Sequence, residues 1–497
     1  RRPGTCLDCG ARRRVTPERL SERGDAFHQA LGREYYLAGA GLKTDPQFQA
    51  IYDQFADLQH ESALETVRAA GIASLWEWAV DLRVGRATAA LDERQIGWEA
   101  ETVLTVDGRE IPYLRAPIEL QNNPDRTFRQ ALDRVRAKTG AVGLAGLRRD
   151  RIGYEHAITA QLTGDDDYVT AVSRLSGMPL ESLAQACEAL LEETDDLYRD
   201  ALARLARRRL GTHVTDLTRA DVGWLFRGES WDEAFTPDAL VTTAERHMRD
   251  LGLDARQGGR VVFDTDERPA KHPRAFCVPV RVPDEVYLVV RLRGGHTDYR
   301  TFWHELGHAM HFASIPADAP FHARWLGDNS VTEGFAMLWD HLTIERSWLA
   351  RYTSCAGLDD LVFELAVNEL HMLRRYAAKL GYEVWLHRSD LAQPGPEYAQ
   401  RLTAATGVRY PEQDALLDVD PAFYAARYLR AWQLEATWAE VFTERYDEDW
   451  WRNPAAGTAV QELMARGQAD PADAMAAAMG RALSFAPAVR RLVHVLD

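Results

Sequence analysis

Apolar residues recur three and four positions apart over most of this chain, and only an α-helix gathers residues with that spacing on one face. Residues 180–210 are typical, with leucines and alanines at helical intervals between charged side chains. The pattern runs from about residue 21 to 210 and again from 355 to 497. The chain is therefore predicted to be mainly α. Residues 1–20 are Arg-rich and patternless, and we expect a disordered segment there.

Two stretches depart from helical spacing. Residues 100–115 alternate apolar and polar positions around Asp107-Gly108, a two-residue turn signal that predicts a β-hairpin. Residues 260–292 are rich in β-branched and aromatic residues and are interrupted by prolines, which predicts a small sheet. Helical spacing resumes directly afterwards, at 298–313. We expect a helical N-terminal region over 21–210 and a second region over 211–497.

The composition narrows the choice of partners. The chain has 497 residues, of which 46% are hydrophobic and 27% charged, as is typical of soluble globular proteins. Its formal charge is −16, from 59 Lys and Arg against 75 Asp and Glu. That charge repels phosphate backbones and anionic membranes, so neither nucleic acid nor membrane is expected as a partner. No stretch of 18 uninterrupted apolar residues predicts a membrane span.

The cysteines point to a reducing compartment. Five cysteines in so long a chain are too few and too scattered for a disulfide framework, which predicts free thiols and a cytoplasmic location. Cys6 and Cys9 form a C-x-x-C pair, but no second Cys or His pair follows at zinc-finger spacing. We interpret this pair as half of a zinc site, and we do not expect it to bind metal.

The sequence His304-Glu305-Leu306-Gly307-His308 is an HExxH motif. It lies on the predicted helix 298–313, where positions four apart share a face and both imidazoles aim at one point. Such a pair grips Zn²⁺ in many hydrolases. The pentapeptide alone arises by chance in roughly a few per cent of chains this long, so its context has to decide.

An acidic residue recurs at a useful distance from the motif. Glu333 lies 25 positions after His308, on a predicted helix over 330–343, and would supply a third ligand while leaving one zinc position open. Two helical turns further on, Asp340 shares its face and would accept a hydrogen bond from a ligand imidazole. The alternatives are that Glu333 is a solvated helix carboxylate and Asp340 a surface charge.

Two further histidines lie close to the motif. His311 is one turn past His308 and either touches the site or is a packed structural histidine. His296 lies after a Gly-Gly pair, and we expect it in water. The motif does not continue as the metzincin pattern HExxHxxGxxH, because His311 and Ser314 occupy the required Gly and His positions.

At these residues the chain resembles the M3 family of zinc metallopeptidases, the thimet oligopeptidase and oligoendopeptidase F group, and more weakly the M2 and M32 peptidases. This is the gluzincin pattern, and it is strongest over residues 275–341. With a weaker similarity further along the chain, the resemblance covers about half of the sequence. Two features depart from the family. Its Pro-Ser pair after the third ligand is replaced by Phe335-Ala336, and its substrate-binding His and glycine-rich loop are absent before Tyr424 and Tyr428.

The resemblance implies a helical ellipsoid of the zincin type, split by a deep central channel that admits only short, unfolded peptides. Zinc would lie on the channel floor, and the strand at 281–292 would offer edge hydrogen bonds to an extended peptide. In such enzymes a tyrosine stabilises the oxyanion. Tyr428 fits that position best, and Tyr424 is the alternative.

The predicted chemistry is amide hydrolysis with one Zn²⁺ per chain. Zinc held by His304, His308 and Glu333 lowers the pKa of its water from about 15.7 towards 7, and Glu305, outside the ligand set, acts as general base. The favoured function is a zinc-dependent oligopeptidase for short peptides. A related zinc amide hydrolase with a dedicated small-molecule or biosynthetic substrate is the alternative. A non-catalytic protein on the same scaffold is the third hypothesis.

Overall fold

Helices make up most of the structure, a computed structural model that describes residues 16–497. The prediction of a mainly α fold with small sheets is confirmed. The pair Cys6 and Cys9 lies outside the described residues. The helices are α1 Pro17–Gly39, α2 Phe48–Gln54, α3 Glu61–Ala70, α4 Ala73–Glu101, α5 Ala116–Asn122, α6 Arg126–Thr163, α7 Tyr168–Ser176, α8 Leu180–Glu193, α9 Asp195–Leu210, α10 Arg219–Leu225, α11 Pro237–Asp250, α12 His296–Ser314, α13 Phe321–Trp325, α14 Asn329–Asp340, α15 Arg346–Tyr352, α16 Leu358–Leu386, α17 Gly395–Thr406, α18 Tyr424–Tyr446, α19 Pro454–Met464, α20 Ala472–Ala478 and α21 Ala486–Leu496.

The first helix begins earlier than the apolar pattern predicts. Thr16 is the N-cap of α1, where its side chain accepts a backbone hydrogen bond, and Pro17 stands in the first turn. Both are favoured residues at those positions. Leu20 is 2% exposed and belongs to a hydrophobic cluster. The expectation of disorder up to residue 20 is therefore wrong for residues 16–20.

The strands form two small sheets. Strands β1 Val103–Val106 and β2 Arg109–Pro112 pair as an antiparallel hairpin, and Asp107 and Gly108 both take positive φ in its turn. Strands β3 Val261–Asp264, β4 Phe276–Arg281 and β5 Glu285–Val289 form the second sheet in the order β3-β5-β4. β5 pairs in parallel with β3 and antiparallel with β4. Because β5 is central, the expectation that its strand offers a free edge is wrong.

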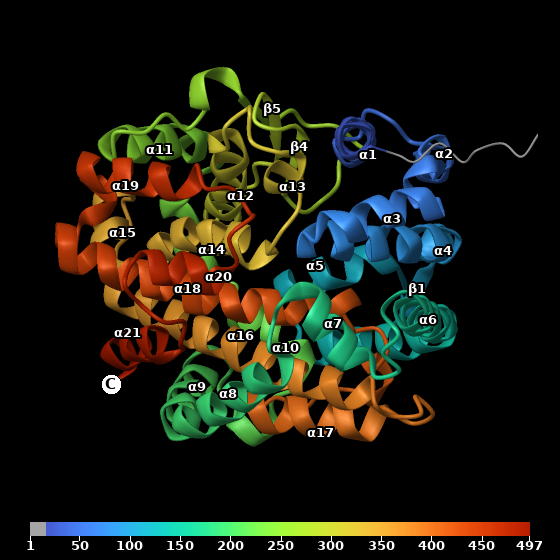
Figure 1. The fold of residues 1–497 in the computed structure, drawn as a ribbon. Helices are drawn as coiled ribbons and strands as arrows, with labels where there is room; N and C mark the ends of the chain where they lie inside the picture. The colour runs from blue at the N-terminus through green and yellow to red at the C-terminus, as the bar shows by residue number, and fades with distance from the viewer. Residues whose placement is uncertain (1–15) are drawn as a thin grey trace, which may run out of the picture.

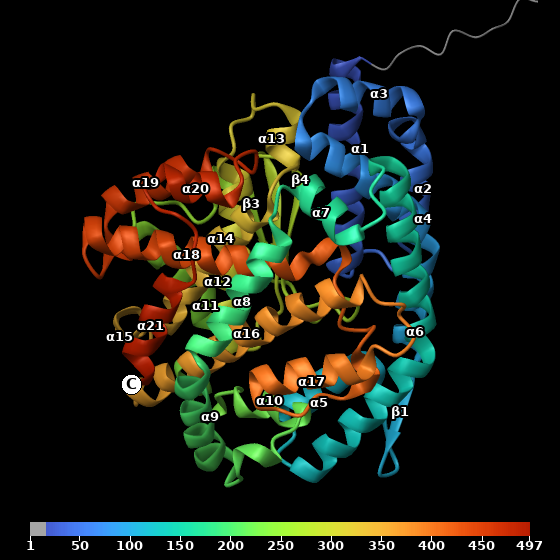
Figure 2. The same cartoon turned by 60° about the horizontal axis from the view of Figure 1, so that its bottom comes forward.

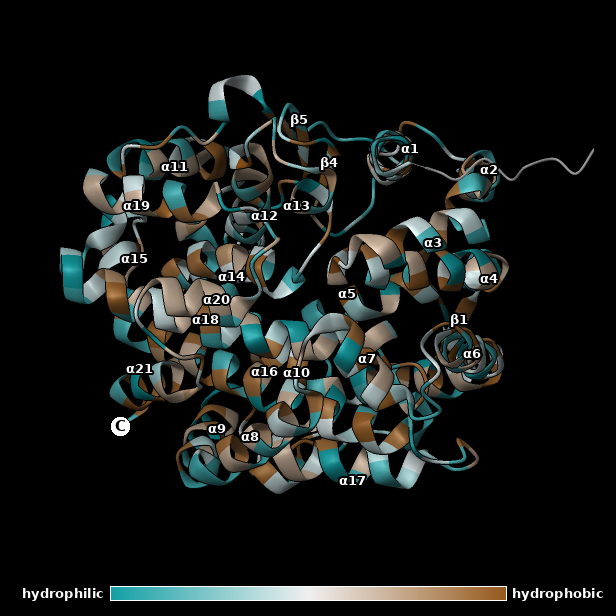
Figure 3. Cartoon of the chain, viewed as in Figure 1, coloured by the Kyte–Doolittle hydropathy of each residue, from teal (hydrophilic) through white to brown (hydrophobic). Residues whose placement is uncertain are grey.

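The N-terminal and C-terminal helices lie on different sides of the molecule. Figure 1 shows the N-terminal helices α1 to α6 gathered on one side and helices α12, α14 and α18 to α21 on the other. Turned by 60°, α4 and α6 run along one border while α16 and α18 lie further inside (Figure 2). Peripheral helices carry alternating hydrophilic and hydrophobic stripes, as expected for helices with one buried face (Figure 3). The deep channel stays a prediction.

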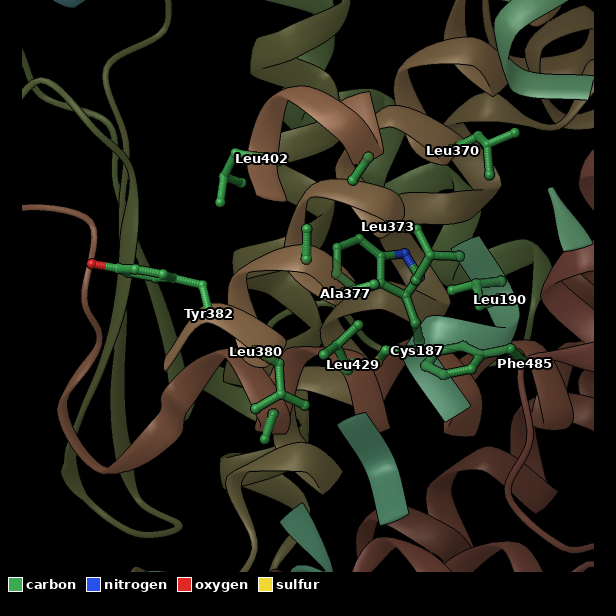
Figure 4. Packing of buried hydrophobic residues seen from close by; sticks show 14 of the residues in the cluster. Cys187, Leu190, Leu370, Leu373, Ala377, Leu380, Tyr382, Leu402, Leu429 and Phe485 are labelled. Carbon is green, nitrogen blue, oxygen red and sulfur yellow. The ribbon is translucent and has the colours of Figure 1, made fainter. Parts of the chain in front are cut away.

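One hydrophobic cluster joins residues from both of the predicted regions. Cys187 and Leu190 of α8 pack with Leu373 and Ala377 of α16 and Leu429 of α18 (Figure 4). Residues from both sides of the boundary expected near residue 210 therefore pack in one core. Among the described residues, no helix is both long enough and apolar enough to cross a membrane.

Candidate metal centre

Helix α12 presents the polar residues of HExxH on one face. Trp303 and Leu306 are fully buried, whereas His304, Glu305 and His308 are half-buried. The apolar residues anchor the helix in the core, and the two imidazoles, four positions apart, project from its other side.

Helix α14 brings a carboxylate to these imidazoles. It starts after Asp328, whose side chain accepts a hydrogen bond from the Ser330 amide at 2.9 Å, and all its residues from Ser330 to Asp340 are buried. The helix packs against both α12 and α18. Gly307 permits the close approach of α12, because a Cβ there would stand 2.5 Å from Cα of Ala336. The glycine inside HExxH is therefore required by packing.

Three potential ligand atoms meet between the two helices. Nε2 of His304 lies 3.3 Å from Oε2 of Glu333, and Nε2 of His308 lies 3.5 Å from the same oxygen. That oxygen is buried and has no hydrogen-bond partner within residues 16–497. Tetrahedral bonds of about 2.0–2.1 Å separate neighbouring ligand atoms by about 3.3–3.4 Å. Two imidazole nitrogens and a carboxylate oxygen at this spacing fit a zinc ion.

Hydrogen bonds orient both imidazoles. Nδ1 of His304 lies 2.9 Å from Oδ2 of Asp340, and Nδ1 of His308 lies 2.8 Å from Oγ1 of Thr332. When each Nδ1–H is the donor, the Nε2 lone pair is directed at Glu333. The structure thus brings Asp340 to His304, as the sequence spacing suggested. The contact of Thr332 was not anticipated, although this residue immediately precedes Glu333.

The charges of the three ligands favour a cation between them. Burial lowers the pKa of His304, but the carboxylates of Asp340 and Glu333 outweigh burial and hold that pKa well above its ordinary value. Burial raises the pKa of Glu333, but the imidazoles of His308 and His304 outweigh it and lower that pKa. Positive charge is therefore stabilised at this point, as a bound metal ion would supply it.

The two tyrosines of α18 have different surroundings. The Tyr424 hydroxyl donates a hydrogen bond to Oε1 of Glu333 at 2.8 Å. The Tyr428 hydroxyl has no hydrogen-bond partner in the described part of the chain, and its ring lies 5.2 Å from that of Tyr424. Burial, followed by the charge of Glu333, raises the pKa of Tyr428, and the Glu305 charge adds to this shift. Tyr428 therefore keeps its proton and can donate a hydrogen bond.

A strained turn places these tyrosines. Ala422 and Phe423, directly before α18, have φ values of 49° and 54°, in the left-handed region that non-glycine residues rarely adopt. Phe423 is fully buried, so the core holds the turn in this conformation. Tyr424 follows as the first residue of α18 and reaches Glu333 from there.

The two additional histidines are structural. His296 is 5% exposed and its Nε2 lies 2.9 Å from the Thr343 carbonyl oxygen, so the expectation that it sits in water is wrong. Burial lowers the pKa of His296 to about 4. His311 is fully buried, with its ring 4.7 Å from that of Phe335, and burial lowers its pKa to about 3. No hydrogen bond joins it to His304, His308 or Glu333 within residues 16–497, and its ring packs against Phe335.

Comparison with known protein families and with curated proteins finds no match for this chain. Solved structures do resemble it. A protein described as a peptidase from Chlamydophila abortus matches 96% of this chain and 89% of its own, with a TM-score of 0.66 and 14% identity. A protein described as an oligoendopeptidase F from Bacillus anthracis strain Ames matches 96% of this chain and 87% of its own, with a TM-score of 0.63 and 12% identity. An M32 carboxypeptidase from Deinococcus radiodurans matches 96% of this chain and 99% of its own, with a TM-score of 0.57 and 16% identity. The chain has the fold of these peptidase structures.

Replacing Gly307 by Ala tests whether the approach of α12 and α14 builds the site. The added methyl group meets the backbone of Ala336, so we expect a loss of about 3 kcal/mol in the free energy of unfolding, measured in denaturant, together with weaker zinc binding. Gly146→Ala is the matched control. It lies in helix α6 with open space around it, and Ala is expected to stabilise that helix by about 0.5–1 kcal/mol. Equal stability of the two variants would contradict the packing argument.

Proposed function

We propose that this protein is a zinc-dependent peptidase that hydrolyses short, unfolded peptides. The observation that carries the proposal is the meeting of His304, His308 and Glu333 at zinc-ligand spacing, with Glu305 next to the first ligand. The imidazole side chains are 21% and 12% exposed, so solvent reaches both rings. The fold shared with peptidase structures supports peptides as substrates.

Each residue of the site has a chemical task. His304, His308 and Glu333 would hold the zinc ion, which when bound would supply Lewis-acid chemistry and a water whose pKa falls from about 15.7 towards 7. The Glu305 carboxylate accepts the proton of the attacking water and passes it to the leaving amine nitrogen. Asp340 and Thr332 hold the imidazoles in the tautomer that leaves Nε2 free for the metal.

The tyrosines divide two further tasks between them. Tyr424 uses its hydroxyl to hold Glu333, so it acts as a positioning residue for the third ligand. Tyr428 keeps its hydroxyl free, and it donates to the carbonyl oxygen that gains negative charge during attack. This division favours Tyr428 as the oxyanion donor.

A Glu305→Gln variant, together with metal removal, tests the chemistry. The amide cannot accept the proton, so we expect at least about a hundredfold lower kcat with zinc content unchanged. A chelator is expected to abolish the activity of the unmutated protein, and added Zn²⁺ to restore it. The measurements are metal analysis and cleavage of a quenched-fluorescent peptide library.

Each outcome separates the proposal from its rivals. Library cleavage that stops with chelator supports a peptidase. Hydrolysis of small amides without any peptide cleavage identifies the dedicated amide hydrolase instead. Bound zinc with no hydrolysis of either substrate class by the unmutated protein would leave a non-catalytic scaffold.

The tyrosine assignment is tested by comparing two single variants. Tyr428→Phe removes one hydrogen-bond donor, typically worth about 3 kcal/mol, and is expected to lower kcat about a hundredfold without changing zinc affinity. Tyr424→Phe frees Glu333 and is expected to weaken zinc binding about tenfold, as measured by competition with a chelator. A normal kcat for Tyr428→Phe would show that this hydroxyl does not serve the reaction.

A further inference from the structure

A chain of buried polar contacts leads from the candidate zinc ligand His304 to the last helix of the protein. We propose that Arg491 of α21 is a positioning residue for the metal site, acting through Glu435, His341 and Asp340. This inference rests on the proposed zinc site and adds a structural role for a helix far from HExxH in sequence. The contacts run in three steps.

The first step consists of the contacts of the Asp340 carboxylate. Its Oδ2 lies 2.9 Å from Nδ1 of His304, and its Oδ1 lies 3.4 Å from Nη2 of Arg300 and 3.5 Å from Nε2 of His341. Asp340 is 5% exposed, so these partners replace water around the carboxylate. The position of the His304 ring thus depends on what holds Asp340.

The second step passes through His341, which follows Asp340 in the chain. Its Nε2 lies 2.8 Å from Oε1 of Glu369 on α16, and its Nδ1 lies 2.7 Å from Oε2 of Glu435 on α18. Burial lowers the pKa of His341, but the charges of Glu369 and Glu435 outweigh burial and raise it to about 9. The imidazolium therefore ties the end of α14 to both neighbouring helices.

The third step reaches α21. Nη1 and Nη2 of Arg491 lie 2.7 and 2.9 Å from the two oxygens of Glu435, a bidentate pair. Glu435 is 1% exposed, and Arg491 and His341 are its ionic partners in the described residues. The neighbouring Arg490 points elsewhere and pairs with Glu440 at the surface.

Apart from the candidate ligand His304, the six charged groups in this chain of contacts balance one another. Three carboxylates, on Asp340, Glu369 and Glu435, face two guanidinium groups and the His341 imidazolium. Removal of one partner from such a buried set leaves an uncompensated charge, which is costly. Without Arg491, His341 is the one ionic partner left to Glu435 among the described residues. We then expect Asp340 and the His304 ring to be held less firmly in position.

Arg491→Met tests the inference, with Arg490→Met as the matched control on the same helix. We expect Arg491→Met to weaken Co²⁺ and Zn²⁺ binding to the metal-free protein about tenfold or more, measured by chelator competition and Co²⁺ absorption. Arg490→Met is expected to bind both ions like the unmutated protein. Arg491→Lys, which keeps one charge, is expected to recover part of the affinity.

The double variant Glu435→Gln with Arg491→Met keeps the experiment decisive if the single variant does not fold. It removes a carboxylate and a guanidinium together, so the charges stay balanced and folding is favoured. His341 still loses the Glu435 carboxylate that holds it, so weaker metal binding than in Arg490→Met is still expected. Unchanged metal affinity in the folded Arg491 variants, even with lower thermal stability, would overturn the inference. Absence of metal binding by the unmutated protein would instead contradict the proposed function.

Discussion

The contact between helices α12 and α14 sets the geometry of the candidate metal site. Gly307 lets the two backbones meet at Ala336, and this approach brings the Glu333 carboxylate within 3.5 Å of both imidazoles. A bulkier residue would move Glu333 on α14 away from His304 and His308, however well each side chain was oriented. The glycine of HExxH therefore has a steric role alongside the chemical roles of its neighbours.

A buried carboxylate that faces two imidazoles needs hydrogen-bond partners that hold all three side chains in place. Each candidate ligand has its own hydrogen-bond partner: Asp340 for His304, Thr332 for His308 and Tyr424 for Glu333. These supports come from α14 itself and from α18, the helix on its other side. The site is thus built by three packed helices, which hold it more rigidly than loops would.

Local features of this site were predictable from sequence, and distant contacts were not. HExxH on a helix fixes its own geometry, and Glu333 and Asp340 lie two turns apart on one helix. Tyr424 meets Glu333 across 91 residues, and no local pattern encodes that contact. The burial of His296 likewise depends on Thr343, 47 residues away.

The fold shows the same division. Helical periodicity predicted the mainly α class, whereas the central place of β5 depends on its parallel pairing with β3, which alternation of side chains does not specify. The start of α1 had a local signal in Thr16-Pro17, but the apolar pattern alone placed the boundary too late. The two regions expected on either side of residue 210 share one hydrophobic core, which no local pattern encodes.

The most direct test of the account is anomalous diffraction at the zinc edge from crystals of the unmutated protein grown with Zn²⁺. The account predicts one strong peak bonded to Nε2 of His304, Nε2 of His308 and the Glu333 carboxylate, at about 2.0–2.2 Å from each. A zinc-loaded crystal with no peak between these side chains, or with Glu333 turned away from it, would contradict the central claim.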